Sequence, residues 1–228
     1  MEKQLLLARQ QKGWSQKQAA FKLKVSQPYL SLLEKGARRL TGKLALRAQE
    51  VYGSSAISMP MNSSPDKVRA TSENNLTASL SALGYPGFSY LPAGQQKNPA
   101  EVLVSALKKD NLDSRLVEAL PWVVLKVQKQ DWQWLVHAAK INDLQNKLGF
   151  LVCVARKLAE KRGEKDIAYL LSNKEKELNK SRLLREDTLC HDSMTKVEKK
   201  WLKEYRSKEA KHWRLLTDLA SENLNYAD

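Results

Sequence analysis

The amino-acid sequence predicts an all-α protein made of a small N-terminal domain and a larger helical domain. Apolar residues recur three and four positions apart over long stretches, which is the spacing that places them on one face of a helix. Alternation of apolar and polar residues over four or more positions, as in a half-buried strand, is scarce. Five of the seven prolines fall between positions 60 and 99, so the domain boundary is expected near there. We therefore predict domains at residues 1–53 and 73–228, joined by a linker at residues 54–72.

The composition is that of a folded, basic protein. Of the 228 residues, 42% are hydrophobic. This is enough to bury one sizeable core or two small ones, and it excludes disorder over most of the chain. The formal net charge is +14, and residues 1–52 hold 11 basic against 3 acidic residues. A basic excess of this kind favours acidic partners such as nucleic acid.

Cysteine usage and hydropathy favour a cytoplasmic location. The two cysteines, Cys153 and Cys190, form no CxxC pair, so neither a disulfide framework nor a zinc cluster is expected. The sequence contains no stretch of about 18 apolar residues, and no apolar leader follows the first Met. It therefore supports neither membrane spanning nor secretion.

Two short helices joined by a tight turn are predicted near the N-terminus. Ser15 opens a capping-box pattern, so a helix begins after it and runs to Leu23. Ser26 offers a second N-cap, and the helix that follows ends before Gly36. A further helix begins after Thr41. The short connection between the first two helices is typical of a helix-turn-helix.

Apolar spacing also predicts the helices of the larger domain. From Trp132 to Leu158 the spacing indicates either one long helix or two, with Gly149 as the weak point. Residues 121–127 form a β-branched run that indicates either a strand or part of a helix. Apolar residues from position 167 onward predict a helix that ends near residues 189–191. One more helical face is predicted to carry four large side chains, those of Met194, Val197, Trp201 and Tyr205.

Residues 3–53 resemble the helix-turn-helix of the phage-repressor or xenobiotic-response-element (XRE) family. The resemblance covers less than a quarter of the chain, and it implies a lambda-repressor-like domain that binds duplex DNA. It also implies a partly buried ion pair between Arg9 and Glu34, and it places Trp14 in an apolar slot between helices. The residues that carry the resemblance are Arg9, Gly13-Trp-Ser-Gln, Ala20, Val25-Ser26-Gln27 and Leu33-Glu34-Lys35-Gly36.

The same resemblance implies that residues 27–32 form the first half of a recognition helix in the major groove. Gln27 would pair with adenine, and Tyr29 would contact a thymine methyl group or a phosphate. Because a residue that precedes proline avoids the α region, the helix begins either at Gln27 or at Pro28. Ser31 is expected on the same exposed face. Phosphate contacts are expected from Gln16, Lys17, Lys35, Arg38, Arg39 and Lys43.

Two further features of the larger domain leave alternatives open. Asn142, Gln145, Asn146 and Arg156 interrupt an apolar pattern, either as a buried hydrogen-bond network or as a surface where another protein docks. The aromatic loop at residues 84–94 is either a compact packed loop or a groove for a partner. No catalytic motif and no metal-ligand spacing is present, so we expect no enzyme activity and no bound cofactor or metal.

Two functions from different classes fit these expectations. The first is a sequence-specific DNA-binding transcriptional regulator whose C-terminal domain dimerises or senses a signal. A homodimer of this kind would read two half-sites of a double-stranded operator. The alternative is an antitoxin, in which the C-terminal domain neutralises a toxin and the N-terminal domain regulates the operon. An effector that alters operator binding would favour the sensor, and a co-purifying neighbour would favour the antitoxin.

Overall fold

The computed structural model describes residues 4–53, 60–61, 63–92, 94 and 97–224. It is mostly helical, with 63% helix and 3% strand, which confirms the predicted all-α class. The chain divides into two compact units, Met1–Asn62 with Gln128–Asp131 and Ser63–Val127 with Trp132–Asp228. Of the predicted linker, residues 54–59 and 62 lie outside the described residues. No described helix has both the length and the apolar character that crossing a membrane requires.

Among the described residues of the first unit, four short α-helices pack around an apolar core. Side-chain oxygens of Ser15, Ser26 and Thr41 accept hydrogen bonds from backbone N–H groups at the starts of the second, third and fourth helices. Each cap satisfies a donor that the first turn leaves unpaired, so each helix begins where the sequence predicts. The helices are α1 (Gln4–Gln11), α2 (Gln16–Leu23), α3 (Gln27–Glu34) and α4 (Gly42–Tyr52).

The second unit is built on eight further α-helices among the described residues. Two two-residue strands, β1 (Asp187–Thr188) and β2 (Leu215–Leu216), pair in parallel near its C-terminal end. Three short 3₁₀ helices complete the described elements of the chain, η1 (Pro86–Phe88), η2 (Lys129–Asp131) and η3 (Ser221–Asn223). The α-helices are α5 (Glu73–Ala82), α6 (Pro99–Leu107), α7 (Ser114–Lys126), α8 (Trp132–Ile141), α9 (Gln145–Lys161), α10 (Lys165–Asn179), α11 (Lys196–Tyr205) and α12 (Lys208–His212).

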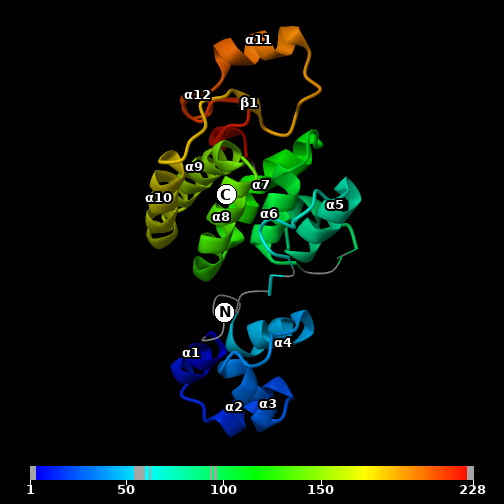
Figure 1. Cartoon of the computed structure of the whole chain (residues 1–228), viewed down its shortest axis with the longest axis vertical. Coiled ribbons are helices and arrows are strands. Elements are labelled where there is room, and N and C mark those ends of the chain that lie inside the picture. The colour runs from blue at the N-terminus through cyan, green and yellow to red at the C-terminus, as the bar shows by residue number, and fades with distance from the viewer. Residues whose placement is uncertain (1–3, 54–59, 62, 93, 95–96, 225–228) are drawn as a thin grey trace. The chain divides into compact units, whose positions relative to one another are not determined.

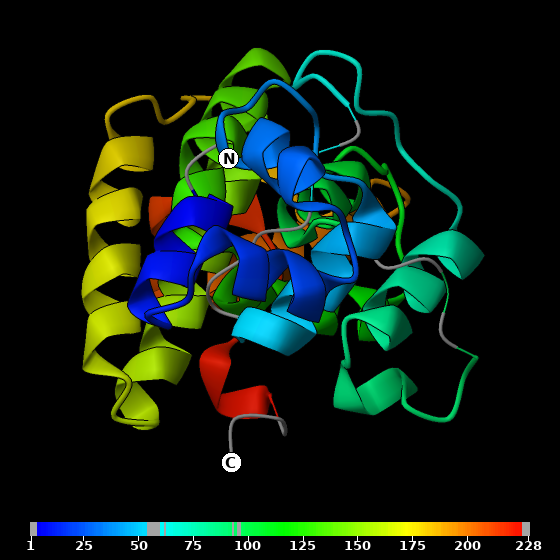
Figure 2. The same ribbon diagram turned by 90° about the horizontal axis from the view of Figure 1, so that it is seen from below.

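Helix α9 is the centre of the second unit. It packs along α10 and against α7 (Figures 1 and 2), and most of its residues are buried. Gly149, on α9, lies directly under the indole of Trp213. A Cβ atom at position 149 would overlap the six-membered ring of that indole. The glycine is therefore a close-approach site in the middle of the helix rather than a break.

Three helix boundaries resolve or correct the sequence predictions. The apolar run from Trp132 to Leu158 forms two helices, and the break falls at residues 142–144, where Asp143 adopts a left-handed backbone. Residues 121–126 form the end of α7, and Val127 is its C-cap, so this run is not a strand. The predicted extension of the helix from residue 167 to residues 189–191 was wrong, because α10 ends at Asn179. Beyond it, the backbone N–H of Leu183 bonds to a side chain of α9 instead.

Three of the four polar residues that interrupt the apolar pattern bond to other segments of the second unit. Asn142 accepts from Lys108 and donates to the carbonyl oxygen of Pro65. Asn146 both donates to and accepts from the backbone of Leu183. Arg156 pairs with two glutamates of α9 and α10, and Gln145 is buried. The contacts of the two asparagines and of Arg156 tie segments of the second unit together, which favours the internal network over a docking surface.

The aromatic loop is partly packed against the second unit. Tyr85 and Phe88 are buried, and the ring of Tyr85 meets that of Trp122 edge-on with centroids 5.3 Å apart. Tyr90 is exposed. This arrangement favours the compact packed loop over a groove for a partner.

Helix α11 presents its apolar face to solvent. Val197, Trp201 and Tyr205 are 78%, 55% and 64% exposed, and only Leu202 of the helix is buried. Leu202 packs with Met194 and Leu216 in a small cluster that holds the helix to the unit. The predicted helical face therefore exists for Val197, Trp201 and Tyr205, but most of it is not part of the core. The prediction was wrong for Met194, because α11 begins at Lys196, after its N-cap Thr195.

Candidate nucleic-acid interface

Helices α2 and α3 lie side by side (Figure 2) and form the predicted helix-turn-helix. Their close approach depends on Ala19 and Ala20, which are fully buried between the helices and the rest of the core. Lys24 ends α2 with a left-handed backbone, and its N–H bonds back to the last turn. Val25 then packs into the turn. Small residues and a tight cap therefore fix the crossing of the two helices.

A partly buried ion pair ties α1 to the end of α3. Arg9 Nε lies 2.7 Å from Glu34 Oε1, and Arg9 Nη2 lies 3.1 Å from Glu34 Oε2. The third nitrogen, Nη1, donates to the carbonyl oxygen of Trp14 at 3.0 Å. The hydrogen bond from Arg9 to Glu34 raises the pKa of the Arg9 guanidinium above its ordinary value. The fork geometry is that of a strong, oriented pair, and the implied Arg9–Glu34 contact is confirmed.

Trp14 packs against the core of the first unit, as its sequence context implies. Its ring lies 5.5 Å from that of Tyr52, and the ammonium of Lys22 sits 4.8 Å from the Trp14 ring centroid. Burial raises the pKa of Tyr52 to about 12, and the negative charge of Glu34 acts in the same direction. Trp14 is therefore a packing residue of this unit.

A chain of side-chain hydrogen bonds leads from the partly buried ion pair to the surface of α3. Gln16 Nε2 donates to Glu34 Oε2 at 3.1 Å, and Gln27 Nε2 donates to Gln16 Oε1 at 3.4 Å. The amide of Gln27 is thus held by Gln16, which is held by the carboxylate of Glu34. Sequence reasoning placed Gln16 and Gln27 separately and missed this link, because it arises where the starts of α2 and α3 meet.

The first turn of α3 is open to solvent. Gln27 is the first residue of the helix, and the Ser26 hydroxyl accepts from the backbone N–H of Tyr29. The helix therefore begins at Gln27, with Pro28 in its first turn, where a missing N–H costs little. Gln27 and Pro28 are exposed, whereas Tyr29 and Ser31 are half-buried, and Tyr29 packs partly on the core.

Leu32 is a second surface feature of α3 that sequence reasoning did not single out. Its side chain is 41% exposed, and it follows Pro28 by four residues on the same helical face. The helical period from Pro28 was the available signal. An exposed apolar group at this place can contact a thymine methyl group.

Five basic side chains, near the start of α2 and from the end of α3 to the start of α4, are not neutralised. All five are exposed. Within the described part of the chain, none of them has an ion-pair partner. Their charges thus remain available to an anionic partner such as a phosphate backbone. They are Lys17, Lys35, Arg38, Arg39 and Lys43.

Comparison with known families bears on the first unit alone. Residues 5–57 match the family model described as helix-turn-helix. No curated protein and no solved structure matches the chain. Residues 5–57 are therefore a helix-turn-helix domain of the XRE and lambda-repressor-like family, the type of domain that binds DNA.

Proposed function

We propose that this protein is a sequence-specific transcriptional regulator that grips a double-stranded operator with residues 1–53. Residues 73–228 form its dimerisation domain, and residues 54–72 join the two. The observation that carries the proposal is the exposed amide of Gln27 at the start of α3. A long hydrogen bond of 3.4 Å to Gln16 connects this donor and acceptor group to the Arg9–Glu34 pair. Amide groups at such a position are suited to reading base edges.

The remaining residues of the interface divide into two roles. Pro28, Tyr29 and Ser31 share the start of the recognition helix with Gln27 and contact base edges or the adjoining backbone. Gln16 and the five exposed basic residues bind phosphates. This second group supplies affinity that does not depend on sequence, whereas the first group supplies the discrimination between sites.

Selection of bound duplexes from a random library tests the proposal. The full chain is expected to enrich one motif. Gln27→Ala is expected to lose preference at one base pair of each half-site, with a cost of about 1–3 kcal/mol on the selected duplex. Gln11→Ala is the matched control, because Gln11 is an exposed glutamine at the end of α1. Absence of any enriched motif, or equal effects of the two variants, would contradict sequence-specific reading.

The dimer is proposed to form through α11. Val197, Trp201 and Tyr205 are four residues apart, so they form one exposed stripe with Trp201 at its centre. If two copies of α11 pack antiparallel about a two-fold axis at Trp201, each Trp201 meets its counterpart, and Val197 meets the partner's Tyr205. The stripe is therefore complementary to itself under the symmetry that most dimers use.

Charged residues beside the stripe also support a second copy of the chain as its partner. Lys200 and Glu204 border one side of the stripe, and neither has a partner within the described residues. Antiparallel packing brings Lys200 toward the partner's Glu204 twice, once on each side of the axis. A hollow of about 510 Å³ next to the stripe, lined in part by Leu112, Val117 and Leu219, extends the apolar area that a dimer of ordinary size must bury.

Light scattering on the full chain tests this interface. The wild type is expected to be a dimer and Trp201→Asp a monomer. Tyr169→Asp, which alters an exposed aromatic residue on α10, is expected to stay dimeric. Trp201→Cys is expected to form a disulfide-linked dimer on oxidation. A wild-type monomer would overturn the dimer. A wild-type monomer that captures its co-expressed genomic neighbour through Trp201 would replace the dimer with the toxin-neutralising alternative.

A further inference from the structure

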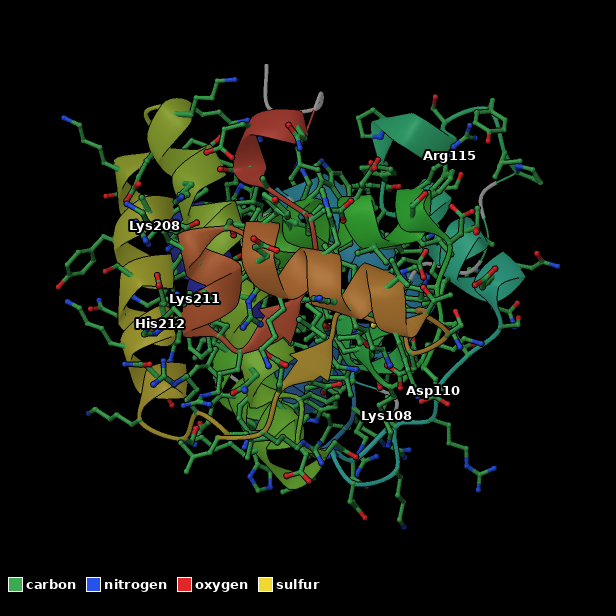
Figure 3. The ribbon with its side chains drawn as sticks, turned by 90° about the horizontal axis from the view of Figure 1, so that it is seen from above. Lys108, Asp110, Arg115, Lys208, Lys211 and His212 are labelled. Carbon is green, nitrogen blue, oxygen red and sulfur yellow. The ribbon has the colours of Figure 1, made fainter. Side chains whose placement is uncertain are left out.

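A basic hollow lies at the edge of α12, in the second unit. Its volume is about 470 Å³. Figure 3 shows Lys208, Lys211 and His212 together on α12, beside α10. Glu186 is its single acidic residue, so the lining carries a formal charge of +4 when His212 is neutral. The cationic side chains of the basic hollow are Arg182, Arg206, Lys208, Lys211 and Arg214.

Backbone carbonyl groups hold the three arginines of the basic hollow in place. Arg182 Nη1 donates to the carbonyl oxygen of His212 at 2.6 Å, and Arg214 Nη1 donates to that of Leu184 at 2.9 Å. Arg206 Nη1 donates to the carbonyl oxygen of Leu215 at 2.9 Å. Because carbonyl groups are neutral, these bonds orient the guanidinium groups without cancelling their charge. The hollow is preorganised and remains cationic.

Carboxylates neutralise little of this charge. Glu186 pairs with Arg206 at 2.8 Å and also lies 3.5 Å from Lys203. Glu209, on α12 itself, is directed to Lys157 of α9, 2.7 Å away. Within the residues that the structure describes, the ammonium groups of Lys208 and Lys211 have no hydrogen-bond or ion-pair partner.

Arg206 retains unused bonding capacity inside the protein. Its side chain is 8% exposed, and its buried Nε–H has no hydrogen-bond partner among the described residues. Arg214 adds a second unfavourable feature, since it holds a left-handed backbone with φ of 54°. Strained non-glycine residues of this kind persist where function or the surroundings require them.

We propose that the basic hollow binds a compact anion that carries two or more linked phosphate groups. Guanidinium forks match phosphate oxygens in geometry, and several converging cations are suited to a multiply charged anion. The cations surround one hollow, whereas binding along a nucleic-acid backbone uses cations spread over a longer track. This anion site goes beyond operator binding and does not depend on it.

Calorimetric titration of the full chain with inorganic pyrophosphate tests the proposal. The wild type is expected to bind one pyrophosphate per chain. The double variant Lys208→Gln/Lys211→Gln is expected to bind at least tenfold more weakly. Lys140→Gln/Lys165→Gln is the matched control, because it removes the same charge from exposed positions of the second unit outside the hollow. The control is expected to bind within twofold of the wild type.

Other results would overturn the anion site. Absence of pyrophosphate binding at millimolar concentration would do so, as would equal weakening in both double variants, which indicates unspecific charge attraction. A third arm measures random-sequence duplex DNA. Suppose that Lys208→Gln/Lys211→Gln loses more DNA affinity than the control variant and that neither variant binds pyrophosphate. The basic hollow is then a DNA-backbone contact instead. Operator selection is a separate measurement, so failure of this proposal and failure of the regulator proposal are distinguishable.

Discussion

The carboxylate of Glu34 accepts hydrogen bonds from both Arg9 and Gln16, so one buried carboxylate links α1 and the start of α2 to the end of α3. Its side chain is 5% exposed. Removal of one partner of a buried pair leaves a charge without compensation, at a cost of about 3–5 kcal/mol. A domain of about 50 residues has little stability to spare.

Arg9→Ala is therefore expected to destabilise α1–α4 by about 3 kcal/mol. Hydrogen exchange of the full chain, read by mass spectrometry, reports the loss as faster exchange confined to the first unit. Arg47→Ala provides the comparison, because Arg47 makes one long hydrogen bond to a backbone carbonyl oxygen, that of Leu23 at 3.4 Å. Its expected cost is about 1 kcal/mol. If Arg9→Ala costs no more than Arg47→Ala, the ion pair is not what stabilises the domain.

Arg38 and Arg39 are expected to add affinity that salt screens. Each phosphate contact releases condensed counterions, so the logarithm of the binding constant falls with the logarithm of salt by about 0.9 per contact. Arg38→Gln and Arg39→Gln should each flatten this slope by about 0.9. Fluorescence anisotropy with a labelled duplex at several salt concentrations gives the slope. Lys140→Gln should leave it unchanged, and an unaltered slope in both arginine variants would remove them from the phosphate contacts.

Gly149→Ala is expected to destabilise the second unit by about 1–3 kcal/mol or more. The added methyl group overlaps the buried ring of Trp213, and overpacking forces shifts in a core that is already dense. Urea unfolding followed by circular dichroism measures the loss. Gly163→Ala is the comparison. An added Cβ atom there meets no neighbour, so its cost comes from backbone strain at a φ of 72° and not from overpacking. A Gly149→Ala variant as stable as the wild type would show that Trp213 moves freely.

The ion pair between Lys157 and Glu209 is expected to contribute a pH-dependent part of the stability. The hydrogen bond from Lys157 lowers the pKa of Glu209 below its ordinary value of 4.5. Because the folded state has the lower pKa, this contribution is complete above pH of about 4.5 and is lost as the pH falls through the folded pKa.

Both side chains are about one-third exposed, so the contribution is expected to stay below about 1 kcal/mol. The stability of the wild type and of Glu209→Gln, measured from pH 7 down to about pH 3, should converge at the acidic end. Glu50→Gln serves as the control, because it changes an exposed glutamate that has no ion pair within the described residues. A difference between wild type and Glu209→Gln that grows toward acid would contradict the assignment.

Local signals predicted the helix-turn-helix well because its determinants are close in sequence. The caps at Ser15, Ser26 and Thr41 act over three residues, and the structure has them where the sequence predicts. The Arg9–Glu34 pair, 25 residues apart, was accessible only through the family resemblance. The bond between Gln16 and Gln27 was not predicted, because it depends on the crossing of two helices.

In the second unit, periodicity identified helices but not their surroundings. Apolar spacing places Val197, Trp201 and Tyr205 on one face, and the same spacing would describe a buried helix. Whether such a face is covered depends on elements that are distant in sequence. For the same reason Gly149 resembled a weak point, although Trp213, 64 residues later, is what requires a glycine there.

The position of Trp213 gives the protein an intrinsic optical probe. Its indole is fully buried, and the imidazole of His212, in the wall of the basic hollow, meets it edge-on with ring centroids 5.3 Å apart. Imidazole groups quench indole emission according to their distance and protonation. In a variant that keeps Trp213 as its one tryptophan, the fluorescence of this side chain would report changes at the basic hollow without any attached dye.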